Sequence, residues 1–113
     1  MTAMMTHISI ARDFSRSPAG RFRSDGPDSG ERFREEILLP AFKRTTGSVE
    51  VDLDGVLGFG SSFLDEAFAG LVRNSSISRE ELQRRLRIRS SIETYKRRII
   101  QYIDEAKPDG RRR

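Results

Sequence analysis

A strand, a glycine-rich turn and a helix follow one another in the segment Val49–Phe68, which constrains the fold more than any other part of the chain. Apolar Val49, Val51 and Leu53 alternate with acidic residues, which is the two-residue period of a strand with one buried face. The turn that follows contains Gly55, Gly58 and Gly60. Glycine allows backbone angles that other residues avoid. The segment predicts an open α/β fold, in which ligands and switches gather beyond the carboxyl ends of the strands.

Two serines stand where this predicted helix begins. Ser61 or Ser62 can accept hydrogen bonds from the first free amides of the helix, and Asp65 completes a Ser-x-x-acid capping box with Ser62. A capping role alone would explain both serines. The alternative is a switch, because a phosphate here would add about two negative charges beside a helix N-terminus, where the amides and the dipole tolerate them. We prefer Ser61 for the switch, since it is less suited to be the buried cap.

Length and composition favour one small domain that needs no metal or cofactor. The chain has 113 residues, 35% of them hydrophobic, so we expect a single domain over residues 1–110 with a thin core, and a homodimer stays open. It has no cysteine and one histidine, which excludes disulfides, thiolate chemistry and an ordinary zinc site. No apolar run approaches the ~20 residues that cross a bilayer, and the N-terminus lacks the pattern of a signal peptide. We therefore expect a soluble, cytoplasmic protein that does not enter the membrane.

Charge is distributed unevenly along the chain. Residues 1–78 carry 9 basic and 11 acidic side chains, whereas residues 79–113 carry 12 basic and 6 acidic ones, three of the basic ones in a tail at 111–113. A basic segment of this kind is typical of a solvated helical surface, or of a surface for nucleic acid or another acidic partner. A nucleic-acid-associated domain therefore stays an alternative, although no reader motif is present.

The rest of the chain alternates between strand and helix patterns. The expected elements besides Val49–Phe68 are a strand over His7–Phe14, a long loop over 15–29, a helix over 30–44, a short helix over 79–85, an edge strand around 86–88 and a helix over 91–106. Pro40 should kink the helix that contains it or end it early. This order predicts an α/β domain with a mixed sheet of about three to five short strands, packed by about four helices.

The loops after the first two strands would open at the same edge of the sheet if those strands are parallel. This arrangement would bring Ser29–Gly30 near Ser61–Ser62. Arg21 and Arg32 flank the first loop, and together with the amides of Ser29–Gly30 they could hold an anion. Pairing of these arginines with neighbouring carboxylates is an equally good interpretation. A small-anion or ligand-binding domain is therefore a further alternative.

Catalytic chemistry has little support in the sequence. Asp52 and Asp54 share a strand face, and Asp65 and Glu66 open the following helix, but no nucleophile and base accompany them. Acidic residues are ordinary on the polar side of a strand and in the first turn of a helix. The single histidine, His7, has no recognisable partner for a catalytic triad. We expect no enzymatic activity and no catalytic residues.

Two blocks of the sequence, Ser29–Pro40 and Ser61–Phe68, resemble the STAS-like family of unknown function that is found in bacteria. The resemblance extends from about Ile8 to Tyr102, and the order and spacing of the blocks are fairly specific. That family is in turn similar to STAS domains, whose best-known members are anti-sigma factor antagonists. The resemblance implies a small non-enzymatic α/β domain that binds a protein kinase of the histidine-kinase ATPase fold, under control of serine or threonine phosphorylation.

The resemblance also implies a position for the switch. STAS domains place the modified serine between a strand and a helix, typically in Asp-Ser-Ser-Gly, and the matching stretch here is Gly60-Ser61-Ser62-Phe63. The strand–turn–serine–helix arrangement thus carries over onto Ser61, without the acidic residue before it. The expected phosphorylation sites are Ser61 and Ser62. The expected partner-binding residues are Gly58, Phe59, Gly60, Ser61, Ser62, Phe63, Asp65 and Glu66.

Overall fold

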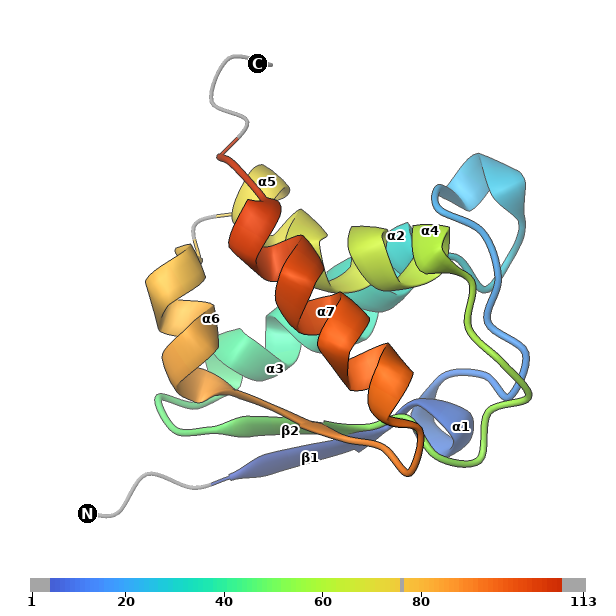
Figure 1. Cartoon of the computed structure of the whole chain (residues 1–113), viewed down its shortest axis with the longest axis horizontal. Helices are drawn as coiled ribbons and strands as arrows, with labels where there is room; N and C mark the ends of the chain where they lie inside the picture. The colour runs from blue at the N-terminus through green and yellow to red at the C-terminus, as the bar shows by residue number, and fades with distance from the viewer. Residues whose placement is uncertain (1–4, 76, 109–113) are drawn as a thin grey trace.

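The computed structural model describes residues 5–75 and 77–108, which form two layers (Figure 1). One layer is a sheet of three parallel strands in the order β1 (Thr6–Ser9), β2 (Val49–Asp52) and β3 (Leu86–Arg89). The helices from α2 onward lie on one side of this sheet. The expected α/β class is confirmed, and β3 is an edge strand as predicted. The expected basic tail lies outside the described residues.

The helical segments are α1 (Ile10–Asp13), η1 (Arg23–Asp25), α2 (Gly30–Phe33), η2 (Arg34–Leu38), α3 (Leu39–Arg44), α4 (Ser61–Leu64), η3 (Asp65–Ala69), α5 (Gly70–Asn74), α6 (Arg79–Arg85) and α7 (Glu93–Glu105). The segments from α2 to α3 form one unbroken helix, and so do those from α4 to α5. With α6 and α7 they make the four main helical runs of the described residues, the number expected. Each long helix contains one π-helical segment, η2 in the first and η3 in the second.

The expectation of a mixed sheet was wrong, because all the described strands run in the same direction. Helices fill the connections from β1 to β2 and from β2 to β3, and a helical crossover returns the chain parallel to the strand it left.

Strand residues alternate between two faces as predicted. Ile8, Val51 and Ile88 share the face toward the helices, while His7 and Glu50 lie on the open face, their Nδ1 and Oε1 atoms 2.7 Å apart.

The first strand is shorter than its apolar pattern predicted. It ends at Ser9, and the chain then turns into the one-turn helix α1 (Ile10–Asp13). The Ser9 hydroxyl accepts a hydrogen bond from the Arg12 amide (3.2 Å), and the Asp13 carboxylate accepts one from the Ser9 amide (2.8 Å). This reciprocal capping satisfies amides at the helix start, so it favours a helix where the isoleucines alone indicated a longer strand.

Pro40 was predicted to kink its helix or to end it early, and the early end does not occur. The chain stays helical from Gly30 to Arg44. The π-helical segment η2 precedes the proline, and there the Leu39 amide donates to the carbonyl of Arg34, five residues back.

The core above the sheet is aromatic at its centre, where Phe33 and Phe63 are fully buried with ring centroids 6.0 Å apart.

Candidate functional site

The carboxyl ends of β1 and β2 meet at one edge of the sheet, because the two strands are parallel and in register. The loops that follow them therefore lead into α2 and α4 from the same end of the molecule (Figure 1). The two helices cross closely at Gly30, where a Cβ atom would lie 2.7 Å from the carbonyl oxygen of Phe63. The predicted proximity of Ser29–Gly30 to Ser61–Ser62 is confirmed.

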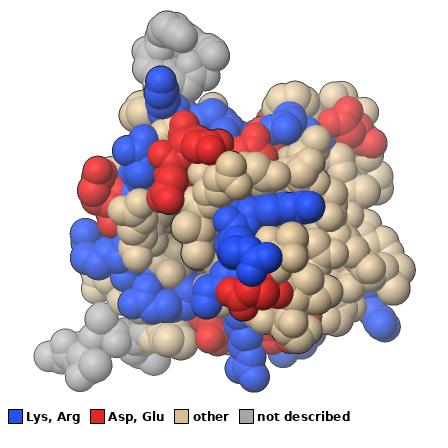
Figure 2. Space-filling view, viewed as in Figure 1, with Lys and Arg blue, Asp and Glu red and all other residues tan. Residues whose placement is uncertain are grey.

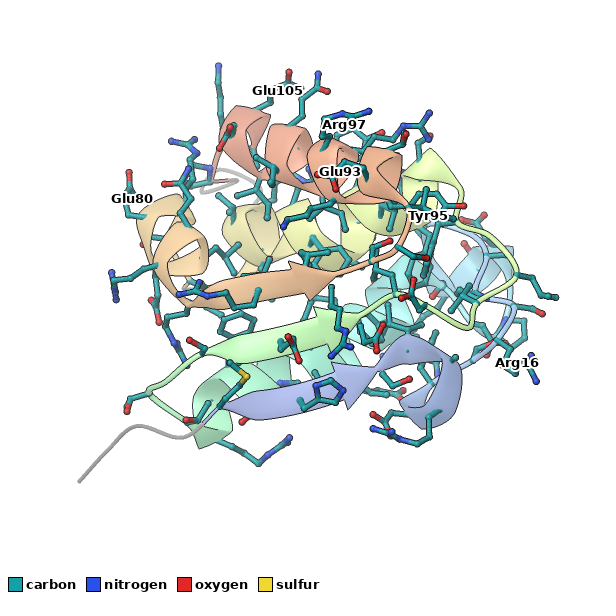
Figure 3. All side chains as sticks on the ribbon, turned by 60° about the horizontal axis from the view of Figure 1, so that its bottom comes forward. Arg16, Glu80, Glu93, Tyr95, Arg97 and Glu105 are labelled. Carbon is teal, nitrogen blue, oxygen red and sulfur yellow. The ribbon has the colours of Figure 1, made fainter. Side chains whose placement is uncertain are left out.

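The loop from β2 to α4 is held at several points. The Leu53 amide donates to the Arg89 carbonyl (2.8 Å) and the Leu57 amide to the Arg16 carbonyl (2.9 Å). The Phe59 amide donates to the hydroxyl of Tyr95 (3.3 Å), which lies at the amino-terminal end of α7 (Figure 3). Contacts from β3, from the first loop and from α7 thus give this loop a defined path.

A second tether involves Asp54, just after β2. Its carboxylate accepts hydrogen bonds from the amide and the hydroxyl of Ser91, at 2.8 and 2.9 Å. The amide bond and then the hydroxyl bond lower the pKa of Asp54 below its ordinary value. Asp54 therefore connects the loops after β2 and β3.

Gly60, and neither serine, caps the helix that begins at Ser61. Gly60 has the extended backbone of an N-cap residue (φ −81°, ψ 155°), and the Leu64 amide donates to its carbonyl (3.3 Å). The predictions that Ser61 or Ser62 caps this helix, and that Ser62 and Asp65 form a capping box, were wrong. The helix starts one residue earlier than a serine cap requires, so both serines have helical backbone and point their side chains outward.

Ser61 and Ser62 are both exposed, and within the described part of the chain neither hydroxyl has a hydrogen-bond partner. The amides of Ser61, Ser62 and Phe63 belong to the first turn, so no carbonyl of the helix can accept from them. Two free hydroxyls thus lie beside unsatisfied donors at the positive end of a long helix. This arrangement can accept a phosphate without disturbing the fold beneath it.

A network of ion pairs lies one turn further along this helix. Arg34 Nη1 in η2 and Glu66 Oε2 in η3 are 2.5 Å apart, and each of these side chains is only 5% exposed. Arg34 also donates to the backbone carbonyl of Glu66 (2.8 Å). The Asp65 carboxylate forms ion pairs with Arg21 of the first loop (2.7 Å) and with Arg73 of α5 (3.2 Å). The network joins the two π-helical segments and ties the first loop to the helix that carries the serines.

Asp65 makes the stability of this network depend on pH. Burial alone would raise the pKa of Asp65, but hydrogen bonds from Arg21 and Arg73 outweigh it and hold this pKa below its ordinary value. A carboxylate with a lowered pKa in the folded state stabilises the fold above its unfolded pKa of about 3.9. That contribution is lost as the pH falls through the folded pKa.

We therefore expect Asp65→Asn to flatten the acid side of the stability profile. The free energy of unfolding in urea, measured between about pH 6 and pH 3, should fall less steeply in the variant than in the wild type, because the amide has no proton to gain. Arg21→Gln should flatten the profile as well, since it removes a donor that lowers the Asp65 pKa. Equal slopes in the wild type and Asp65→Asn would contradict this account.

The four residues expected to hold an anion already have partners. The amide of Gly30 donates to the Gly20 carbonyl (2.9 Å), and buried Ser29 caps α2 by accepting from the Arg32 amide (3.1 Å). The Arg32 guanidinium pairs with Asp28 at 3.1 Å, and Arg21 pairs with Asp65. An anion would have to displace these bonds. The alternative interpretation, pairing with carboxylates, describes the observed contacts of both arginines, and anion binding stays a prediction.

The expected partner-binding residues divide into exposed and buried groups. Gly60, Ser61 and Ser62 are exposed, and Gly58 and Asp65 are partly exposed. The remaining three are Phe59, Phe63 and Glu66, which are buried. They support the surface from beneath and cannot contact a partner in this conformation. The two phenylalanines pack in the core, and Glu66 belongs to the ion-pair network.

Leu57 is a residue that the analysis of the sequence missed. Its side chain is 80% exposed, in the loop held by Arg16 and Tyr95. An apolar residue set between glycines in a loop was the available signal. We define the recognition surface as Leu57, Gly60, Ser61 and Ser62. In Figure 2 the area over the loop from β2 to α4 is largely uncharged, whereas charged side chains crowd the area over α6 and α7.

The fold and the site define a small α/β domain that places serines between a strand and a helix at the carboxyl edge of a parallel sheet. A family model described as a STAS-like domain of unknown function (DUF4325) matches residues 29–96, and the chain belongs to this family. The match contains both blocks that carried the resemblance. No curated protein and no solved structure gave a match. Among the described residues, no helix has the length and apolar character needed to span a membrane.

Proposed function

We propose that this chain is a non-enzymatic regulatory domain that binds another protein through the recognition surface and is switched by phosphorylation of Ser61. The observation that carries the proposal is the pair of exposed, unbonded serine hydroxyls at the start of a helix, with an exposed leucine in the loop that leads into it. Membership in the STAS-like family supports a role like that of an anti-sigma factor antagonist. The partner is then a protein kinase of the histidine-kinase ATPase fold, and the site of action is the cytoplasm.

Phosphorylation would change the surface and leave the core intact. A phosphate on Ser61 would meet the free amides of the first helical turn, which favour negative charge. Ser61 and Asp65 are four residues apart on one helix, so the phosphate would also lie beside the pair of Arg21 and Asp65. Added charge on this surface would oppose its burial against an apolar partner surface. Binding would weaken while the domain stays folded.

We expect Ser61→Asp to weaken binding of the native partner by at least about tenfold, or about 1.4 kcal/mol. The measurement is affinity purification from the native host with wild-type bait, followed by titration of the recovered protein against wild type and variant. Ser24→Asp is the matched control, because Ser24 is an exposed serine in η1, outside the recognition surface. Mass spectrometry of the wild-type chain from cells should find phosphate on Ser61.

Two results would contradict the proposal. Equal binding of wild type and Ser61→Asp, with Ser61 unmodified in cells, would leave an interaction module without a serine switch. Recovery of nuclease-sensitive material alone would favour the nucleic-acid alternative, which predicts steeply salt-dependent binding.

A further inference from the structure

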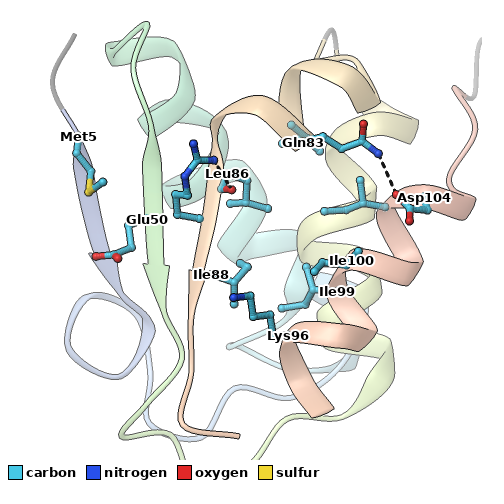
Figure 4. Close-up of a pocket in the computed structure, with 12 residues that line it drawn as sticks. Met5, Glu50, Gln83, Leu86, Ile88, Lys96, Ile99, Ile100 and Asp104 are labelled. Atoms are coloured by element: carbon cyan, nitrogen blue, oxygen red, sulfur yellow. Dashed lines mark hydrogen bonds between the residues drawn. The ribbon is translucent and has the colours of Figure 1, made fainter. Parts of the chain in front are cut away.

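A groove with a volume of about 600 Å³ runs between edge strand β3 and helix α7, away from the recognition surface (Figure 4). Leu86 and Ile88 of β3 and Ile99 and Ile100 of α7 line it. Ile100 is 48% exposed, and the two β3 side chains are only partly buried. The groove is therefore an apolar surface that the described residues leave uncovered.

Basic side chains flank this apolar floor. Arg87 and Lys96 line the groove, and Arg89 follows on the same face of β3 as Arg87. Within residues 5–75 and 77–108, none of the three lies within ion-pair distance of a carboxylate, although the charge of Arg89 helps to lower the pKa of Asp54. Arg87 donates to the carbonyls of Arg84 and Leu86. Charges of this kind are available to an incoming acidic group.

The acidic residues of the groove come from elements other than β3. Asp104 of α7 accepts a hydrogen bond from Gln83 (2.9 Å), and Glu50 of β2 is hydrogen-bonded to His7. These two carboxylates equal Arg87 and Lys96 in number along the lining. The charged side chains of β3 itself are Arg87 and Arg89, so a segment that pairs with this strand has basic side chains as its nearest charged neighbours.

The backbone of β3 offers a further attachment point. The Arg89 carbonyl accepts a hydrogen bond from Leu53, so the peptide groups of Arg89 face β2. Successive residues of a strand direct their amide and carbonyl groups to opposite sides, so those of Ile88 face the open edge. An added extended segment can pair with them, as in strand addition to a sheet edge.

We propose that this groove binds a short extended segment of a protein partner in which acidic and branched aliphatic side chains alternate. The aliphatic side chains would cover Ile88 and Ile100, and the acidic ones would face Arg87 and Arg89. A second copy of this chain fits poorly, because its own β3 would bring like charges together. Nucleic acid fits poorly as well, since it would leave the isoleucines uncovered. The proposal does not depend on Ser61, because none of the groove residues belongs to the recognition surface.

The test uses two pools of fluorescein-labelled peptides of roughly eight residues, the length of an ordinary strand. One pool alternates Asp or Glu with Ile, Leu or Val, and the other alternates Lys or Arg with the same aliphatic residues. Fluorescence anisotropy with the full chain should show saturable binding of the acidic pool, and the amide resonance of Ile88 should shift. Ile100→Asp and Arg87→Glu should each weaken this binding by about tenfold.

Phe22→Asp is the matched control, because Phe22 has the same 48% exposure as Ile100 and lies in the first loop. It should bind the acidic pool like the wild type, and circular dichroism should give the same spectrum for all variants. The proposal is overturned if the acidic pool binds no better than the basic pool, or if Ile100→Asp leaves binding unchanged. A dimer that Ile100→Asp dissociates would assign the groove to a second copy, and competition by a short oligonucleotide alone would assign it to nucleic acid.

Discussion

Replacing Glu66 with alanine is expected to lower the free energy of unfolding by about 3–5 kcal/mol, because it leaves the Arg34 guanidinium buried without its carboxylate. Two contacts of Arg34 soften the loss. Arg34 would keep its hydrogen bond to the backbone carbonyl of residue 66. Its Nη2 atom also lies 3.6 Å from Oε2 of Glu35 at the surface. We therefore place the expected value near the lower end of this range. Chemical denaturation in urea, with the midpoint and slope fitted together, measures it.

Glu36→Ala is the matched control for this prediction. Glu36 pairs with Arg23 and Arg32, but at the exposed surface, where an ion pair contributes little. The free energy of unfolding of Glu36→Ala should therefore be close to that of the wild type. A Glu66→Ala variant as stable as Glu36→Ala would contradict a structural role for the buried pair.

The double substitution Arg34→Met with Glu66→Leu separates the effect of a lost partner from that of a lost charge pair. Replacing a buried ion pair by apolar side chains of similar size is often neutral or stabilising, because the cost of desolvating both charges disappears. The double variant should therefore regain most of the stability that Glu66→Ala loses. A double variant as unstable as the single one would mean that the packing between η2 and η3 requires these two side chains themselves.

Periodic patterns predicted most of the elements, because each pattern reports one local geometry. Alternation around Val51 predicted β2, and the stripe containing Ile99 and Ile103 predicted α7, whose buried residues these are. Helix starts were harder. A serine, Ser78, caps α6, whereas Gly60 caps α4 in place of the predicted serine. A serine cap would have accepted from an amide of the first turn, whereas Gly60 has no side-chain acceptor. The loop contacts that decide where the helix starts come from distant residues.

The ion-pair network could not be predicted from local patterns. Its members come from the first loop and from the two long helices, and only the packed fold brings them together. Glu66 had been expected on the partner-binding surface because it lies in the block Ser61–Phe68, one of the two that carry the family resemblance. The close crossing of the helices buries it instead against Arg34. A crossing this close depends on small residues, and Gly30 and Gly70 both lie where the helices meet.

Gly30→Ala is expected to lower the free energy of unfolding by about 2 kcal/mol, because the new methyl group would overlap backbone that cannot move aside. The added Cβ would lie 2.7 Å from the Phe63 carbonyl oxygen and 3.2 Å from the Ala67 amide nitrogen. Both atoms belong to the helix that carries Ser61, so relief requires the two long helices to separate. The greater helix propensity of alanine offsets at most about 1 kcal/mol of the clash.

Gly60→Ala is the matched control, because a Cβ atom at Gly60 would meet nothing within 4 Å and the backbone there is not left-handed. Gly60→Ala should lower the free energy of unfolding by only roughly 0.5 kcal/mol, because alanine is a weaker N-cap residue than glycine. Urea denaturation of both variants under the same conditions measures the difference. If Gly30→Ala proves as stable as Gly60→Ala, the two helices do not cross closely at Gly30. The proximity of the two serine pairs would then lose its main support, since Gly30 holds α2 against the turn from which Ser61 and Ser62 project.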